Sequence, residues 1–171
     1  NLDPGWPAVG IWLVDTEHLW VGGQLCGNAT IKGITFRNCA YGGALISSGS
    51  QNNSFIDCTF YNNGASGIKV DGEGASHDGS QYSSDVTLQN CTFYNNAQSG
   101  VHIYHTEDIT IENCVSYGNT QNGFLIAESS NVDISNCRTY SNTQSGIWFI
   151  SDCHNNSVTG CEIGGSAGGN G

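Results

Sequence analysis

The sequence has few charged residues and very few basic ones. Only 4 residues are Lys or Arg, against 15 Asp and Glu, and charged residues make up 11% of the 171 residues, compared with about 25% in ordinary globular domains. A nucleic-acid-binding protein needs a cluster of cationic side chains to neutralise phosphates, so this class is excluded. Methionine is absent, and Gly contributes 24 residues. Because Gly, Asn, Ser and Thr all rank low in helix propensity, this composition predicts an all-β protein.

A long apolar segment is also missing. The longest apolar run covers residues 8–14, with Gly10 inside it, whereas a helix that spans a bilayer needs about 20 residues. We therefore expect no membrane span. The chain begins at Asn1 without the basic and hydrophobic segments of a signal peptide, so we expect that such a peptide is absent or already removed. The expected location is extracellular or at the cell surface.

A repeat runs through most of the chain. Five units open with a Gly that precedes alternating apolar positions, as in Gly43-Ala-Leu-Ile, Gly67-Ile-Lys-Val, Gly100-Val-His-Ile, Gly123-Phe-Leu-Ile and Gly146-Ile-Trp-Phe. These glycines are 24, 33, 23 and 23 residues apart. Later in each unit an Asn-Cys pair is followed by a Tyr and an Asn, as in Asn90-Cys91, Tyr94 and Asn96. A period of 20 to 50 residues is typical of a solenoid, in which each repeat buries its inner face by stacking on the next.

This repeat, G-[IVF]-x-[VIF] followed by [VI]-x-[IL]-x-N-C-x-x-Y-x-N, resembles that of the right-handed parallel β-helix family, which includes pectate lyases and NosD-like proteins. The resemblance covers Gly43 to about Ile163. It implies an all-β, single-domain, right-handed parallel β-helix of about six to seven coils, with three short strands per coil. We expect an N-terminal capping segment at residues 1–30, the β-helix at 31–165 and a flexible tail at 166–171. The fold does not fix a function, since this family contains enzymes, adhesins and structural rods.

Six cysteines occupy one position in successive coils and are expected to form an inward-facing column: Cys39, Cys58, Cys91, Cys114, Cys137 and Cys161. Three interpretations remain open. Free thiols pack well as small apolar groups. Disulfides between adjacent coils are also compatible with a stacking distance of about 4.8 Å. A thiolate column that binds a soft metal is disfavoured, because closely spaced Cys pairs are missing.

The opening strands of the coils are predicted to carry the chemistry. Alternation directs Lys69, Asp71, His102, Tyr104 and Trp148 outward on adjacent rungs of the first sheet. The resemblance implies that this sheet commonly carries the active site. In a polyuronate lyase or epimerase, Lys69 or His102 would be the base and Tyr104 the acid.

A ten-residue insertion after Val70 adds acidic residues next to this face. Asp71, Glu73 and Asp78 could supply oxygen ligands to Ca²⁺. The sequence indicates no other cofactor and does not require this one. A glycosidase would need two opposed carboxylates. The available pairs are Asp71 with Asp78 and Asp71 with Glu128. Alternatively, all these groups are solvated polar side chains on a rung.

Two further sets of residues point outward. The ladder of Tyr61, Tyr94, Tyr117 and Tyr140 either stiffens the sheet or forms, with Trp148, an aromatic strip for sugars or a partner. N-glycosylation sequons begin at Asn28, Asn52 and Asn155.

The function we predict is an extracellular, non-catalytic β-helix module that acts in structure, adhesion or carbohydrate contact. Its partner would be a polysaccharide or a second copy, since open β-helix ends favour stacking into a filament. The alternative is a polysaccharide lyase, epimerase or glycoside hydrolase that acts at the first-sheet face.

Overall fold

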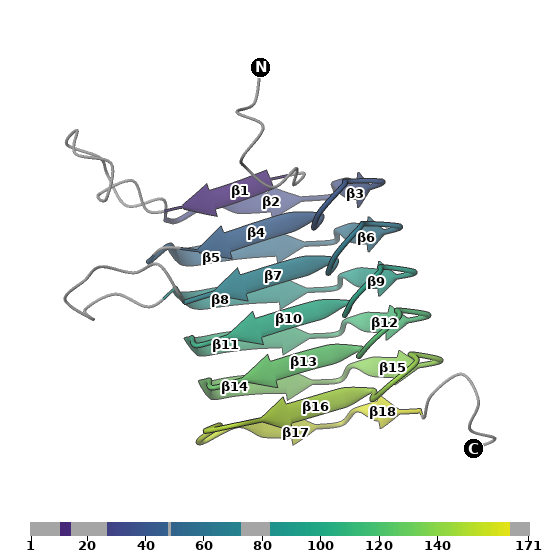
Figure 1. Cartoon of the computed structure of the whole chain (residues 1–171). Helices are drawn as coiled ribbons and strands as arrows, with labels where there is room; N and C mark the ends of the chain where they lie inside the picture. The colour runs from purple at the N-terminus through teal and green to yellow at the C-terminus, as the bar shows by residue number, and fades with distance from the viewer. Residues whose placement is uncertain (1–10, 15–26, 48, 73–82, 165–171) are drawn as a thin grey trace.

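The computed structural model describes residues 11–14, 27–47, 49–72 and 83–164, and these form a parallel β-solenoid (Figure 1). Three strands per coil build three parallel sheets of six strands each. The all-β fold is confirmed. In the described residues the six strands of each sheet are separated by five coil-to-coil steps, which corresponds to about five full turns and differs slightly from the six to seven coils predicted. The tail 166–171 and most of the capping segment 1–30 lie outside the described residues.

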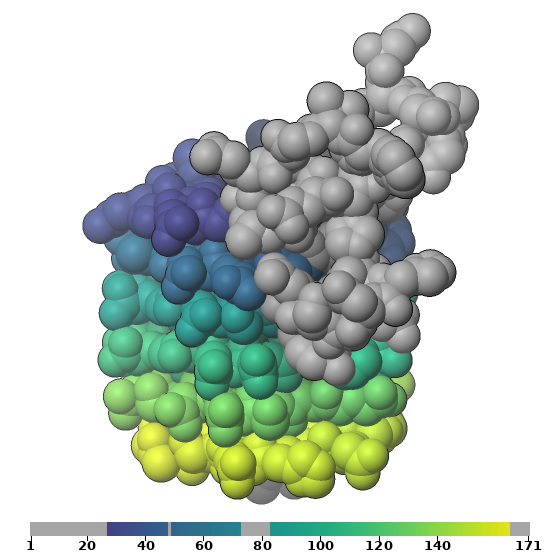
Figure 2. Space-filling view, turned by 90° about the vertical axis from the view of Figure 1, so that its left-hand side faces the viewer, coloured from purple at the N-terminus to yellow at the C-terminus, as the bar shows by residue number. Residues whose placement is uncertain are grey.

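The first sheet consists of β1 (Ile11–Val14), β4 (Ala44–Ser47), β7 (Ile68–Asp71), β10 (Val101–Tyr104), β13 (Phe124–Ala127) and β16 (Ile147–Ile150). The second consists of β2 (Thr30–Lys32), β5 (Gln51–Ile56), β8 (Ser84–Gln89), β11 (Glu107–Glu112), β14 (Ser130–Ser135) and β17 (Ser157–Thr159). The third consists of β3 (Thr35–Arg37), β6 (Thr59–Tyr61), β9 (Thr92–Tyr94), β12 (Val115–Tyr117), β15 (Arg138–Tyr140) and β18 (Glu162–Ile163). Figure 2 shows the coils as stacked layers from the N-terminal to the C-terminal end. No helix in the described part of the chain is long and apolar enough to cross a membrane.

The corners between sheets require residues in the left-handed backbone region. Asn90, Asn113 and Asn136 have φ of 54°, 53° and 52°, a conformation that Asn adopts more readily than most residues. The Asn of each Asn-Cys pair therefore suits the corner in which it lies. The repeated Gly has another purpose, since a Cβ on Gly67 would lie only 2.6 Å from the carbonyl oxygen of Gly100 in the next coil.

The core is a set of apolar columns that run along the solenoid axis. Phe36, Phe60 and Phe93 stack with ring centroids 4.8 and 5.0 Å apart, and Phe60 and Phe93 are fully buried. Buried Ile, Val and Leu from the first two sheets fill the rest of the interior. Each such side chain contributes about 1.5–3 kcal/mol through burial, so coil-to-coil stacking supplies most of the stability.

A buried amide ladder joins the coils on one side of this core. Asn63, Asn96, Asn119 and Asn142 are at most 2% exposed. The backbone N–H and the side-chain amide of Asn96 both donate to Oδ1 of Asn119, each over 3.0 Å. The same pair of bonds links Asn119 to Asn142. Buried polar groups need such partners, so the Asn at this position of the repeat holds successive coils in register.

The seven cysteines within the described ranges are free thiols. The backbone N–H groups of Cys91, Cys114 and Cys137 each point at the sulfur in the next coil, over 3.4 Å. The pKa of Cys114 is raised by its hydrogen bonds to Cys137 and Cys91 and by burial. Cys58, Cys91, Cys114 and Cys137 pack here as small residues of the apolar core. The oxidation state of the column stays a prediction.

Candidate functional site

The outer face of the first sheet brings four polar side chains together on two adjacent rungs. In β7 and β10 alternate residues are buried, so the intervening Lys69, Asp71, His102 and Tyr104 lie on the outer face. Parallel pairing places His102 beside Lys69 and Tyr104 beside Asp71. The predicted catalytic residues Lys69, His102 and Tyr104 therefore share one surface, as alternation indicated.

The charges on this surface largely offset one another. Nζ of Lys69 lies 2.5 Å from a carboxylate oxygen of Asp71, and the two side chains are 25% and 15% exposed. An ion pair at this partial burial engages the ammonium and the carboxylate with each other. Lys69 is thus not a free base, and the predicted metal ligand Asp71 already has a cationic partner.

His102 has an unusually low pKa. Its pKa is lowered to about 4, first because burial disfavours the charged imidazole and second because the Lys69 ammonium lies nearby, while Asp71 opposes both effects. The imidazole is therefore neutral at neutral pH. Its ring centroid lies 6.4 Å from that of Tyr104, so the two side chains border the same patch of surface.

Towards the C-terminal end the same face becomes apolar. Leu125 pairs with Trp148 and Ala127 pairs with Ile150 between β13 and β16. Trp148 is 42% exposed. An exposed aromatic ring thus lies two rungs from His102, and the face passes from polar to aromatic along the solenoid.

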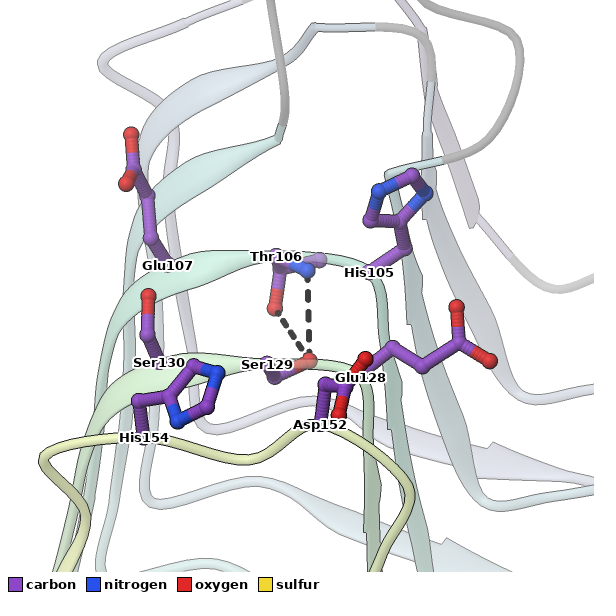
Figure 3. A pocket seen from close by; sticks show the side chains of 8 residues that line it. All are labelled: His105, Thr106, Glu107, Glu128, Ser129, Ser130, Asp152 and His154. Atoms are coloured by element: carbon purple, nitrogen blue, oxygen red, sulfur yellow. Dashed lines mark hydrogen bonds between the residues drawn. The ribbon is translucent and has the colours of Figure 1, made fainter.

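A pocket of about 300 Å³ lies where the first sheet turns into the second. We call it the corner pocket (Figure 3), and its lining comes from three successive rungs: His105, Thr106 and Glu107; Glu128, Ser129 and Ser130; Asp152 and His154. The centroids of the Tyr104 and His105 rings are 6.0 Å apart. The corner pocket is therefore continuous with the first-sheet face.

The backbone at the corner pocket is unusual. Of the non-glycine residues with positive φ in the described ranges, all are Asn, Asp or Ser except His105, with φ of 53°, and Glu128, with φ of 47°. Longer side chains pay a larger steric cost in this region, and such strain clusters at functional sites. The sequence suggested Glu128 only as a possible carboxylate of a glycosidase and did not predict the pocket. The sequence did contain a signal for the pocket. His105 and Glu128 each follow the end of a first-sheet strand, where an Asn or Gly that forms the corner is expected.

The predicted calcium ligands are not brought together within the structure as described. Glu73 and Asp78 lie outside the described residues. No group of three His, Cys, Asp or Glu among the described residues is arranged to hold a metal ion. Calcium binding by the insertion stays a prediction.

The tyrosine ladder lies on the third sheet, away from Trp148 on the first. The rings of Tyr61, Tyr94, Tyr117 and Tyr140 stack with centroids 4.8, 5.1 and 5.0 Å apart and planes within 6° of parallel. Their faces cover one another, and the Arg138 guanidinium lies 4.8 Å from the centre of the Tyr140 ring. This geometry supports the interpretation in which the ladder stiffens the sheet, because a sugar would need an open ring face to stack on.

The three sequon residues are exposed. Asn28, Asn52 and Asn155 have φ of 60°, 54° and 53°. The left-handed conformation alone accounts for Asn at these positions. Glycosylation of these residues stays a prediction.

Comparison with known proteins identifies the repeat. The family model described as "Right handed beta helix region" matches residues 8–107 and again residues 74–170. No curated protein sequence matches the chain.

Several solved structures share the fold. The A-module of the mannuronan C-5 epimerase AlgE4 from Azotobacter vinelandii is 17% identical, with a TM-score of 0.52 over 79% of this chain and 53% of that chain. The periplasmic alginate epimerase AlgG is 16% identical, with a TM-score of 0.54 over 82% of this chain and 35% of that chain. The pectate lyase Pel9A is 14% identical, with a TM-score of 0.52 over 80% of this chain and 48% of that chain. The chain thus spans about half the length of these structures or less, and the likeness concerns the fold.

Proposed function

The chain belongs to the right-handed β-helix family, and we propose that it is an extracellular or cell-surface module that holds a polysaccharide against the outer face of its first sheet without chemically changing it. The observation that carries this proposal is the composition of that face. Lys69 and Asp71 form an ion pair whose charges cancel, and His102 is neutral. Both lie on the same sheet as the exposed Trp148. Directed hydrogen-bonding groups beside an aromatic surface suit a hydroxyl-rich ligand of low charge.

The same face supports binding more than catalysis. Glycoside hydrolysis needs two carboxyl groups on opposite sides of the scissile bond. Among the described outward residues of the first sheet, Asp71 is the one carboxylate, and it is paired with Lys69. A lyase or epimerase needs a cation for the substrate carboxylate, and the ammonium of Lys69 is already engaged.

The structural neighbours support the ligand class and the location. Their names refer to mannuronan, alginate and pectate, and one of them is a periplasmic protein. A net charge of −11 opposes the binding of polyuronates, which repel an acidic surface unless a cation such as Ca²⁺ bridges the two. We therefore place neutral glycans ahead of polyuronates as ligands.

The test combines binding with turnover. The protein is titrated with soluble pectin, alginate, neutral glucans and xylan, with and without Ca²⁺, and each mixture is analysed for new reducing ends, unsaturated products and changed uronate composition. We expect binding of at least one neutral glycan, weakened by His102→Ala, and no turnover. Turnover that His102→Ala abolishes would overturn the non-catalytic assignment and establish the rival, a polysaccharide lyase, epimerase or hydrolase. That rival rests on the neutral His102 beside Tyr104, which could accept a proton.

A second role, end-to-end self-association, is favoured by the last described coil. Ile163 is 54% and Val158 40% exposed, although the residues that pair with them in the preceding coil, Thr139 and Ile134, are buried. A second copy stacked on this coil would cover both side chains and pair the strand edges. Sedimentation and electron microscopy test this role. Filaments that Ile163→Asp disperses would support it, and a concentration-independent monomer would exclude it.

A further inference from the structure

We propose that the corner pocket binds a sugar unit with a free amino group, so that the ligand is an amino-sugar-containing glycan. The proposal deepens the proposed function, on which it rests for the presence of a glycan on the neighbouring face. It goes further by assigning a separate subsite and a charge to one unit of that glycan.

The first argument is charge. Glu107, Glu128 and Asp152 line the corner pocket, and no Lys or Arg is among its lining residues. Of the four basic residues, Lys69 is paired with Asp71 on the face, and Lys32 and Arg138 pair with Asp57 and Glu162 elsewhere. The fourth, Arg37, ends β3 on the third sheet. Although the three acids that line the pocket are exposed, a hollow lined by one sign of charge raises the local concentration of ligands of the opposite sign. The corner pocket therefore favours a protonated amine over a neutral acetamide and disfavours a uronate.

The second argument is the shape and the range of polar groups. A hollow of about 300 Å³ is at the lower end of the volumes that small-molecule sites occupy, so it suits one sugar ring. The two imidazoles of His105 and His154 come from rungs on either side of the Glu128 rung (Figure 3). Imidazole, hydroxyl and carboxylate groups together can donate to and accept from the hydroxyls of a sugar. A bare metal ion fits less well, because no three of these ligands converge among the described residues.

The third argument is that the floor of the corner pocket is preorganised. Ser129 is buried, donates to the carbonyl oxygen of Ala127 over 2.7 Å and accepts from the backbone N–H of Thr106 over 3.2 Å. These bonds fix the corner on which Glu128 is mounted in its strained left-handed conformation. A rigid floor below charged side chains lowers the ordering cost of binding.

The fourth argument is position. His105 directly follows Tyr104, whose ring lies on the first-sheet face 6.0 Å away. A chain bound along that face would therefore reach the corner pocket at the rung of β10. The proposed polysaccharide and the amino-sugar unit can thus belong to one ligand.

The experiment uses the whole chain and short ligands, because a cationic polymer would bind any acidic protein. Chitobiose with both amines free is titrated by calorimetry at pH 6 and 150 mM NaCl, and N,N′-diacetylchitobiose and digalacturonate are titrated alongside. Imidazole signals are followed by NMR. We expect the free amine to bind at least about tenfold more tightly than the acetylated sugar, and the signals of His105 and His154 to shift. Glu128→Gln and Asp152→Asn should each weaken binding about threefold to tenfold, as expected for a partly exposed charged hydrogen bond.

Asp133→Asn is the matched control, because Asp133 is an exposed acid on β14 that does not line the corner pocket. Its effect should stay below about twofold. Equal binding of the acetylated sugar, equal effects of Asp133→Asn and Glu128→Gln, or no binding of the free amine would each overturn the proposal. Shifts confined to His102, with quenching of Trp148, would place amino sugars on the face and overturn the pocket alone. Pocket binding without any glycan on the face would instead retain the pocket and remove the proposed function.

Discussion

The third and the first sheet differ in how their outer faces use successive rungs. On the third sheet one residue type repeats, and four tyrosines stack ring on ring within 6° of parallel. On the first sheet each rung differs, and the outward column runs through Leu45, Lys69, His102, Leu125 and Trp148. The scaffold is the same in both sheets, with parallel strands in register.

The difference separates residues that stabilise the solenoid from residues that can serve a ligand. Identical neighbours one rung apart stack on each other and are selected by that contact. A column of unlike residues gains little stability from stacking. Its composition is therefore explained better by contact with a ligand. If this distinction holds, substitutions in repeated columns should change the free energy of unfolding, and substitutions in irregular columns should change binding.

The largest effect is expected in the repeated column that is fully buried. Asn119→Ala removes the oxygen that accepts two bonds from Asn96 and the amide that donates to the carbonyl oxygen of Phe93 over 3.3 Å. Each buried group left without a partner costs about 1–3 kcal/mol, so we expect a loss of about 4 kcal/mol in urea denaturation. Asn95→Gly, at an exposed left-handed corner, should change stability by less than about 0.5 kcal/mol. Similar losses for both variants would show that the amide ladder is not what holds the coils.

The second largest effect is expected in the pH dependence of stability, through His102 in the irregular column of the first sheet. The pKa of His102 lies near 4 in the folded protein, below its ordinary value of 6.5, so the unfolded chain binds a proton first as the pH falls. The free energy of unfolding should therefore decrease between about pH 6.5 and 4, by at most about 3 kcal/mol, since one unit of pKa corresponds to about 1.4 kcal/mol. His102→Gln should remove this part of the pH dependence. Parallel stability curves for the two proteins would mean that His102 keeps its ordinary pKa in the folded protein, so that the face would gain a positive charge as the pH falls below about 6.5.

A smaller effect is expected in the tyrosine ladder. Tyr117→Ala removes two stacked contacts, to Tyr94 and Tyr140, and should cost about 2 kcal/mol by thermal or chemical unfolding. Tyr117→Phe keeps the ring and should cost less than about 0.5 kcal/mol. Neither variant should alter glycan binding. Weakened binding by Tyr117→Phe at unchanged stability would reassign the ladder to ligand contact.

Repetition is also the reason why the fold could be predicted from the sequence. Each repeated residue type in the sequence forms a stacked column along the solenoid. The Gly, the Asn-Cys pair and the Tyr mark three positions of the repeat. The outward position of Lys69 and His102 followed from alternation alone. Even the Lys69–Asp71 ion pair could have been predicted from the sequence, because residues two apart on one strand share a face.

The corner pocket was not predictable in the same way. His105, Glu128 and Asp152 line the corner pocket without sharing a residue type or one position of the repeat. Ser130 pairs with His154, and the connection from β16 to His154 is one residue longer than the connection from β13 to Ser130. A repeat-based alignment therefore does not bring Asp152 beside Glu128. The lowered pKa of His102 also depends on burial, which the sequence does not specify for an outward position.

The smallest effect in free energy is the most direct test of the comparison. Trp148 contributes an exposed ring to the irregular face at the last described coil, so Trp148→Ala should weaken binding of a neutral glycan about tenfold, or about 1.4 kcal/mol. Its stability should change by less than about 0.5 kcal/mol, since little of the loss is core packing. Ile163→Ala is the matched control, because Ile163 is 54% exposed, against 42% for Trp148, and lies in the same coil but on the third sheet. Calorimetry with the glycan that binds most tightly measures the loss of affinity in the two variants. Equal weakening by both variants would mean that the open end of the solenoid, and not the first-sheet face, contacts the ligand.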